Sequence, residues 1–267
     1  MKVSKYLLAT LAASFIFAGC SEADEVQDNI NETSGNTTKT SEVEEDAVGQ
    51  STKEKLANID TTDDKALDAV IERSKDIGSY EALINLEGKI DNAHPDVLQA
   101  DVRFKEGEAG GPPSLHLKSE GEDRTFSKGG ETFYYNGTDW VDISESAGVE
   151  HLFQVTYHNV VLSFAHIKDK LEQEDHGDTI VYSYDGESKE VFQTFKQLFA
   201  DDFGNINIST IENSLEIEVD ADENLIKDID YQAEGKSENG SFELTGDVEF
   251  ESFNSIGEIE IPEEVRQ

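Results

Sequence analysis

The side chains best suited to chemistry in this chain are six histidines, one cysteine and 59 carboxylates. Three of the histidines, His151, His158 and His166, stand seven and eight residues apart. A zinc-binding helix of the His-Glu-x-x-His type needs two histidines four residues apart, and structural zinc sites commonly use cysteines. We therefore expect these histidines at the surface or at helix ends, and we expect no metal ion and no cofactor.

A second candidate is the acidic stretch Asp220-Ala-Asp222-Glu-Asn224, which resembles the start of a calcium-binding loop. An EF-hand loop then requires glycine at its sixth position and glutamate at its twelfth. Leu225 and Tyr231 occupy those positions here. Because the stretch falls between two strand-like segments, we predict a hairpin turn with no dedicated calcium site.

Nucleophilic and phosphate-binding motifs are absent from the sequence. There is no Gly-x-Ser-x-Gly elbow and no glycine-rich phosphate loop. Carboxylates are so numerous that a pair of them does not indicate acid–base catalysis. We predict that the protein is not an enzyme; a hydrolase with an unrecognised site is the remaining alternative of that class.

The single cysteine, Cys20, follows a short segment with the features of an export signal. Lys2 and Lys5 provide a positive start, and residues 6–17 form an apolar run that is too short to span a bilayer, which needs about 20 residues. The segment resembles a bacterial lipoprotein signal, with Phe17 where leucine is typical, and this implies that Cys20 becomes the lipidated N-terminus. The alternative is an ordinary signal peptide with a chance cysteine.

We divide the chain into three parts on this basis. Residues 1–19 are a lipoprotein signal peptide, residues 20–61 are the lipidated cysteine and a disordered acidic tether, and residues 62–267 are one folded domain. The tether contains no aromatic residue and too little apolar surface to fold. The expected location is the outer face of the cytoplasmic membrane, held there by the lipid.

The formal net charge of −38 limits the partners of the protein. Nucleic acid is excluded, since its recognition needs basic patches, and anionic lipid headgroups would repel the domain. We interpret the acidity as an adaptation to salt or alkali; a generally acidic protein without such adaptation is the alternative.

Strands give the clearest folding signal. Apolar residues alternate with polar ones in segments that read as half-buried strands of an antiparallel sheet. Asn136-Gly137 marks a hairpin turn between two aromatic arms. We expect nine to eleven strands, with apolar alternation at Tyr80–Ile90, Leu98–Phe104, Leu115–Leu117, Leu215–Val219, Leu225–Ala233, Phe242–Phe250 and Ile259–Ile261.

Helical spacing of apolar residues occurs in three places. The first is residues 62–78, with Asp63 or Asp64 as the N-cap. The second is residues 149–171, which we expect to form one helix or two helices broken near His158. The third is residues 189–202, with a clear apolar face.

These elements predict an α+β fold in which a large curved antiparallel sheet, a half-open barrel, wraps around about three helices. The element order, the segment Gly130–Trp140 and the closing Ile259–Pro262 resemble the LolA/LppX superfamily of lipoprotein and lipid carriers. The chain is also similar to the uncharacterised Bacillus-type lipoproteins of Gram-positive bacteria with that fold. The resemblance implies that acyl chains or other apolar ligands bind between sheet and helices.

Inward-pointing apolar residues are the candidates for lining such a cavity. For each of them, the alternative is that it simply fills the core. The candidates are Leu117, Phe133 (or its neighbour Tyr134), Trp140, Phe153, Phe164, Phe192 and Phe195.

The function we expect from this combination is that of a monomeric, membrane-anchored extracytoplasmic lipoprotein that binds or carries a lipid or other apolar ligand. The alternative is a non-enzymatic envelope sensor or protein-interaction module built on the same fold. A long acidic tether suits such a searching domain.

Overall fold

The computed structural model describes residues 52–59, 62–91, 93–145, 149, 153–198, 208–237 and 240–267. Cys20, the predicted signal peptide and nearly all of the predicted tether lie outside these residues. None of the helices in the described ranges is long and apolar enough to cross a membrane.

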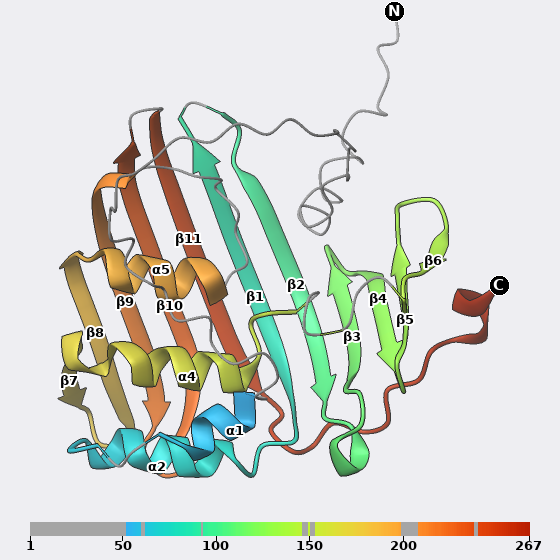
Figure 1. Ribbon diagram of the computed structural model, residues 1–267, viewed down its shortest axis with the longest axis horizontal. Helices are drawn as coiled ribbons and strands as arrows, with labels where there is room; N and C mark the ends of the chain where they lie inside the picture. The colour runs from blue at the N-terminus through green and yellow to red at the C-terminus, as the bar shows by residue number, and fades with distance from the viewer. Residues whose placement is uncertain are drawn as a thin grey trace, which may run out of the picture.

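One open sheet of eleven antiparallel strands forms the body of the protein (Figure 1). Its order is β6-β5-β4-β3-β2-β1-β11-β10-β9-β8-β7, so β6 and β7 are its two edges. The strands are β1 (Ser79–Ile90), β2 (Asp96–Lys105), β3 (Ser114–Ser119), β4 (Glu122–Lys128), β5 (Glu131–Tyr135), β6 (Trp140–Asp142), β7 (Glu172–Asp175), β8 (Thr179–Glu187), β9 (Ile208–Asp220), β10 (Leu225–Ser237) and β11 (Gly240–Glu251).

The alternation seen in the sequence places one set of side chains in a common core. Ile84 of β1 faces Ala100 of β2 on one side and Val248 of β11 on the other, and all three are buried. The hairpin at Asn136-Gly137 joins β5 to β6, and the Asn136 side chain accepts bonds from the backbone N–H groups of Thr138 and Asp139. The predicted antiparallel sheet, its strand count and this turn are confirmed.

The predicted strand at Ile259–Ile261 is wrong. Residues 256–262 have no regular secondary structure, although Ile259 and Ile261 are buried. Their alternation reflects alternate burial of side chains in an extended segment that lies against a sheet without joining it.

Four described α-helices accompany the sheet. Asp64 caps the N-terminus of α2 by accepting bonds from Ala66 and Leu67, as predicted, and the helix ends before Gly78. In the second predicted helical segment, Val149 is helical, residues 153–156 have no regular structure, and α4 begins at Tyr157, capped by Thr156. The helices are α1 (Thr52–Ala57), α2 (Lys65–Ser74), α4 (Tyr157–Ile167) and α5 (Lys189–Leu198), with short 3-10 turns at Glu108–Gly110, Lys168–Lys170 and Glu263–Arg266.

Helix α1 corrects the predicted domain boundary. It lies within the segment assigned to the tether, yet Leu56 is 1 % exposed and belongs to the main core. The packed part of the chain therefore extends N-terminal of the predicted boundary between residues 61 and 62.

All four helices lie on one face of the sheet, which we call the inner face (Figure 1). Helices α4 and α5 cross in front of β8–β11, while no described helix lies in front of β2–β6. The opposite, outer face of β9–β11 carries mainly glutamate and aspartate, as at Glu216, Glu218 and Glu249. The two faces of the sheet thus differ in character. The described helices cover only about half the width of the apolar inner face.

Candidate functional site

The space between the sheet and the helices is filled by aromatic side chains. Phe195 of α5 stacks on Tyr231 with ring centroids 4.7 Å apart, and Phe164 of α4 meets Tyr182 edge-on at 4.7 Å. Phe192 lies 5.2 Å from Phe242. Since rings in such contact leave little free volume, this region is a packed core.

Predicted lining residues Phe153, Phe164, Phe192 and Phe195 all belong to this main core and are no more than 4 % exposed. Phe153 packs against Phe104 at the end of β2, with ring centroids 6.2 Å apart. The structure brings these four residues together as core side chains.

Phe133 and Trp140 are not where an inner cavity would place them. Phe133 faces Phe126 in the register of β4 and β5, and Phe126 in turn faces His116 on the outer side of β3. Both phenylalanines belong to a second, smaller cluster with Ile261 and Val265, against which Trp140 packs. The alternation within β5 puts Tyr134 inward, so of the two adjacent aromatics that the sequence left open, Tyr134 faces the inner side and Phe133 does not.

The candidate site is the stretch of inner face that no described helix covers. Leu86 and Leu98 face each other across β1 and β2, and Ile90 continues the same row. Ile90 is 45 % exposed and Leu98 is 37 % exposed, whereas Ile84, three inward positions before Ile90, and Ala100, one inward position after Leu98, are buried. The apolar alternation therefore continues beyond the point where burial ends.

Ile90, at one end of this open stretch, pairs with Phe242 of β11, whose ring lies under α5. The predicted lining residue Leu117 of β3 lies outside the stretch: it stands opposite the buried Val102, four residues from Leu98 along β2, and packs against the main core. We call the group Leu86, Ile90 and Leu98 the open inner patch.

Two hollows in the described part of the chain are lined mainly by polar groups. One, of about 590 Å³, lies where the start of α2 approaches β7 and β8, and carries Asp63, Lys65, Lys168 and Asp175. The other, of about 240 Å³, lies on the outer face around Arg103. Their linings do not suit an apolar ligand, which leaves the open inner patch as the candidate for one.

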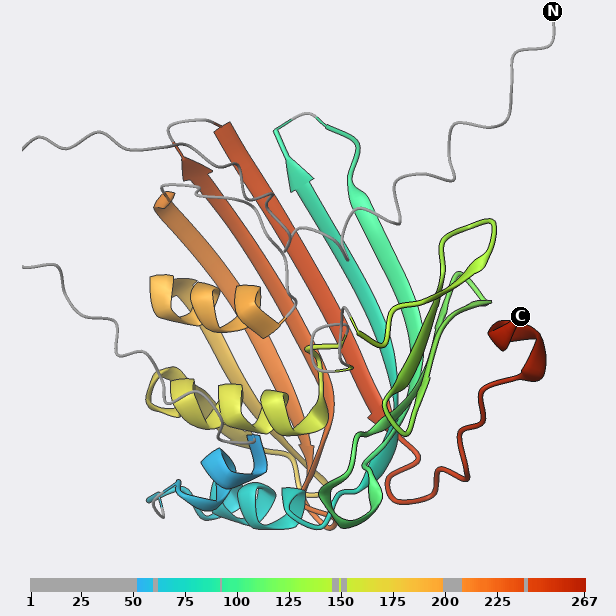
Figure 2. The same ribbon diagram turned by 45° about the vertical axis from the view of Figure 1, so that its right-hand side comes forward.

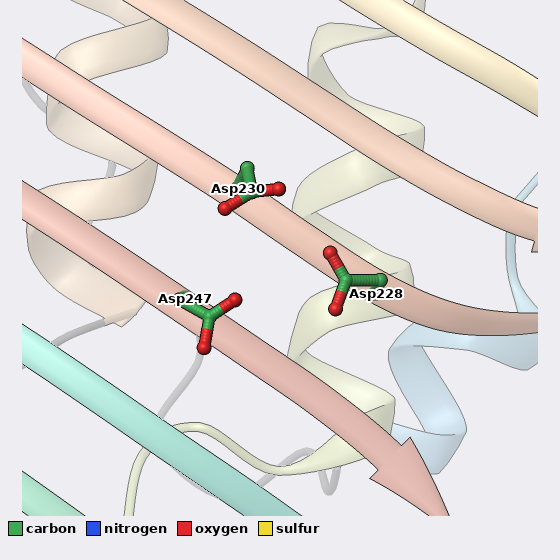
Figure 3. Close-up of side chains that lie close together, drawn as sticks. All are labelled: Asp228, Asp230 and Asp247. Atoms are coloured by element: carbon green, nitrogen blue, oxygen red, sulfur yellow. The ribbon is translucent and has the colours of Figure 1, made fainter.

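A carboxylate cluster on the outer face is the group in the described residues that could hold a metal ion (Figure 3). Asp228 and Asp230 of β10 and Asp247 of β11 each offer an oxygen within 4.8 Å of the others. Burial, together with the neighbouring Asp230, Asp247, Glu218 and Glu249 carboxylates, raises the pKa of Asp228 to about 7.

Such an all-oxygen, anionic group matches the ligands of a hard cation such as Ca²⁺. Asp247 already accepts a hydrogen bond from Asn85 at 2.8 Å. Sequence reasoning missed the cluster. Two aspartates two residues apart on a strand give a one-sided acidic row, but only the register shows that Asp247 stands opposite Asp230.

The predicted hairpin turn at Asp220–Asn224 is confirmed: Asp220 accepts bonds from the Asp222 and Glu223 N–H groups between β9 and β10. His158, in contrast, is buried near the start of α4, and its Nε2 donates to the Ser74 carbonyl at 3.0 Å. The expectation of a helix-end histidine holds for His158, and that of a surface position does not.

Buried tyrosines fix the helices to the sheet. The hydroxyl of Tyr80 on β1 accepts a bond from the Tyr157 N–H, and the hydroxyl of Tyr157 accepts one from the Ile226 N–H of β10. Burial raises the pKa of both hydroxyls. These groups are satisfied structural links, which hold α4 at a set height on the inner face.

A scan against protein-family models finds no match, and a search of curated proteins also finds none. Among solved structures, the chain is similar to the LolA superfamily protein NE2245 from Nitrosomonas europaea, at 9 % identity and a TM-score of 0.27, over 77 % of this chain and 97 % of that one. It is also similar to Rv2717c from M. tuberculosis, at 12 % identity and a TM-score of 0.25, over 70 % of this chain and 97 % of that one.

Proposed function

We propose that this protein is a lipid-anchored extracytoplasmic protein that binds an apolar ligand, such as a lipid acyl chain, on the open inner patch. The observation that carries the proposal is the exposure of Ile90 and Leu98 on β1 and β2, whose inward side chains further along, such as Ile84 and Ala100, are covered. Large apolar side chains grouped on one exposed surface are typical of binding sites.

The energetics suit a ligand with its own apolar surface. Covering the exposed parts of Leu86, Ile90 and Leu98 would contribute about 2 kcal/mol. Each buried methylene of an acyl chain adds about 0.8 kcal/mol, so the ligand supplies most of the affinity.

The sequence resemblance to the LolA/LppX carriers implies an acyl chain bound between sheet and helices, in a half-open barrel. Because aromatic rings occupy that space here, the proposed site is displaced to the helix-free part of the same face. A ligand there would extend the cover that α5 provides over β9–β11.

The anchor is the second part of the proposal. Lipidated Cys20 would hold the chain at the outer face of the cytoplasmic membrane, and the acidic tether would keep an acidic domain away from headgroups. The role is binding without catalysis or cofactor, by a monomer whose contact with the membrane is the lipid itself.

Solvent extraction of the full chain from membranes, followed by mass spectrometry, tests the ligand. We expect about one lipid per chain beyond the anchor, and loss of that lipid in a Leu98→Glu variant. Recovery of no stoichiometric lipid would reject the ligand. A Cys20→Ala variant tests the anchor separately: it should leave the membrane fraction, and retention there would contradict lipidation.

A second candidate is a sensor or protein-interaction module. It is favoured by the openness of the patch, since an exposed apolar surface fits a protein partner as well as a lipid. Crosslinking in the native membrane through a photoreactive group at position 98 separates the two. A single protein adduct would support this candidate, and lipid adducts alone would reject it.

A further inference from the structure

The outer face of β2–β5 differs from the rest of that face. Lys105, Lys128 and the ring of Phe126 lie on it, and the His116 ring stacks on Phe126 at 4.3 Å. Phe133 and Trp140 complete an aromatic group. Elsewhere the outer face is dominated by carboxylates, so this basic and aromatic area is the part of it that can attract an anion.

Residues 256–267, the C-terminal strap, lie over this area. Figure 1 shows the chain passing the lower ends of β1–β3 after β11, and Figure 2 shows it on the side of β3–β6 away from the helices. Ile261 and Val265 pack with Phe126 and Phe133. The strap thus covers aromatic rings that would otherwise be exposed.

Ion pairs hold the acidic residues of the strap. Glu258 pairs with Lys105 at 2.9 Å and with Lys128 at 3.5 Å, and Glu260 pairs with Lys128 at 2.8 Å. Both lysines lower the pKa of the Glu258 carboxyl. Arg266 completes the set by pairing with Glu131 at 2.7 Å.

No backbone hydrogen bond joins residues 257–267 to the described strands. The strap begins with Ile256, whose N–H donates to the Ser79 hydroxyl, and its later backbone bonds, such as that from Val265 to Pro262, lie within the strap around the 3-10 turn Glu263–Arg266. Its contacts with the sheet are made by side chains, and Glu258 and Glu260 are 64 % and 71 % exposed. Exposed ion pairs of this kind are weak and are screened by salt.

The geometry points to a peptide-binding surface on the outer face of β2–β5 that the strap occupies in cis. It fits an extended segment of a partner protein in which acidic residues alternate with branched apolar ones, as Glu258-Ile259-Glu260-Ile261 does. Lysines meet the carboxylates and the aromatic group receives the apolar side chains. A competing segment must overcome the high effective concentration of the tethered strap.

Trp140, the one tryptophan of the chain, reports on this surface directly. The test compares two proteins in mild detergent: the intact chain and a chain that ends after Ser255. Each is titrated with a synthetic peptide of residues 256–267. We expect saturable binding with a blue shift of the tryptophan emission, and at least tenfold weaker binding to the intact chain. A peptide with Glu258→Lys and Glu260→Lys should bind at least tenfold more weakly.

Matched variants on the same face separate the specific surface from general charge. Lys128→Glu removes the partner of both glutamates and should weaken peptide binding at least fivefold. Lys118→Glu makes the same charge change on β3, where no ion pair of the described chain links the lysine to the strap, and should leave binding within twofold. Equal losses in the two variants would overturn the proposal.

If the shortened chain does not fold, the intact chain with Ile261→Ser and Val265→Ser takes its place. This chain keeps the strap but removes its anchors, so it should bind the peptide more tightly than the unmodified chain. Absence of peptide binding by whichever folded variant is used would overturn the proposal. The proposal that a lipid binds at the open inner patch, on the other face of the sheet, does not depend on either outcome.

Discussion

Strands β8–β11 and strands β2–β5 belong to the same sheet, yet only the second group is covered on its outer face as well, while its inward Val102, Phe104 and Leu115 are buried in the main core. Helices α4 and α5 cover the inner face of the first group, whose outer face is bare and acidic (Figure 1). The C-terminal strap covers the outer face of the second group, where Phe126 and Phe133 point outward. Inward positions there include the small hydroxyl residues Thr125 and Thr132.

The difference shows that cover follows the apolar side chains, whichever face they occupy. At the junction of the two groups, the open inner patch breaks this rule, because Ile90 and Leu98 are apolar and exposed, and among the described residues neither a helix nor the strap covers them. That exception is the reason to expect a ligand.

The largest effect is expected in the helix-covered group. Phe195→Ala should lower the free energy of unfolding by about 3–5 kcal/mol, because the ring is 1 % exposed and stacked on Tyr231. Urea titration followed by circular dichroism measures this. Val97→Ala, at an exposed outer position, should change it by less than about 0.5 kcal/mol. A loss below about 1 kcal/mol for Phe195→Ala would show that the space under α5 is loosely filled.

A smaller loss is expected where the strap provides the cover. Phe133→Ala should cost about 2 kcal/mol, because the cluster is small and the strap can settle onto the vacated space. The same titration, with emission from Trp140 as a second signal, measures it. A loss equal to that of Phe195→Ala would remove the distinction between the two covers.

The bare acidic face should affect stability through pH. In the folded protein Asp228 keeps its proton up to about pH 7, whereas its ordinary pKa is 3.8. The folded state therefore binds more protons between pH 4 and 7, and the free energy of unfolding falls as pH rises through that window. Allowing for solvent screening, we expect a fall of about 1–2 kcal/mol.

Asp228→Asn should flatten this dependence, and Asp222→Asn, in the exposed β9–β10 turn, should leave it unchanged. Thermal unfolding at a series of pH values measures both. A stability that rises from pH 4 to 7 in the unmodified chain, with no change in the Asp228→Asn variant, would contradict the carboxylate cluster as described.

Much of the sheet could be predicted from sequence because alternation is a local signal. The polar residues next to Tyr80, Ile84 and Leu98 in the sequence indicate which face of the sheet these side chains occupy. Asp64 indicates a helix start because aspartate is a favoured N-cap residue. Ile259 and Ile261 show the limit of that signal. Alternate burial produces the same pattern with or without a hydrogen-bonded partner strand, so the strap looked like a strand.

The candidate site depended on information that the sequence does not carry locally. Adjacent aromatics such as Phe133 and Tyr134 are equally apolar, and only pairing to β4 decides which one points inward. The extent of helical cover is likewise a tertiary property. No pattern in β1 or β2 shows that burial ends at Ile84 and Ala100.

Photolabelling of the full chain in its native membrane with a diazirine-bearing fatty acid tests the open inner patch most directly. Adjacent residues on opposite faces provide a matched pair: Leu98→Glu places a charge in the patch, and Val97→Glu places the same charge on the outer face. We expect labelled peptides from β1 and β2, at least fivefold less label in the Leu98→Glu variant, and no change in the Val97→Glu variant. Equal labelling of both variants and the unmodified chain would contradict it.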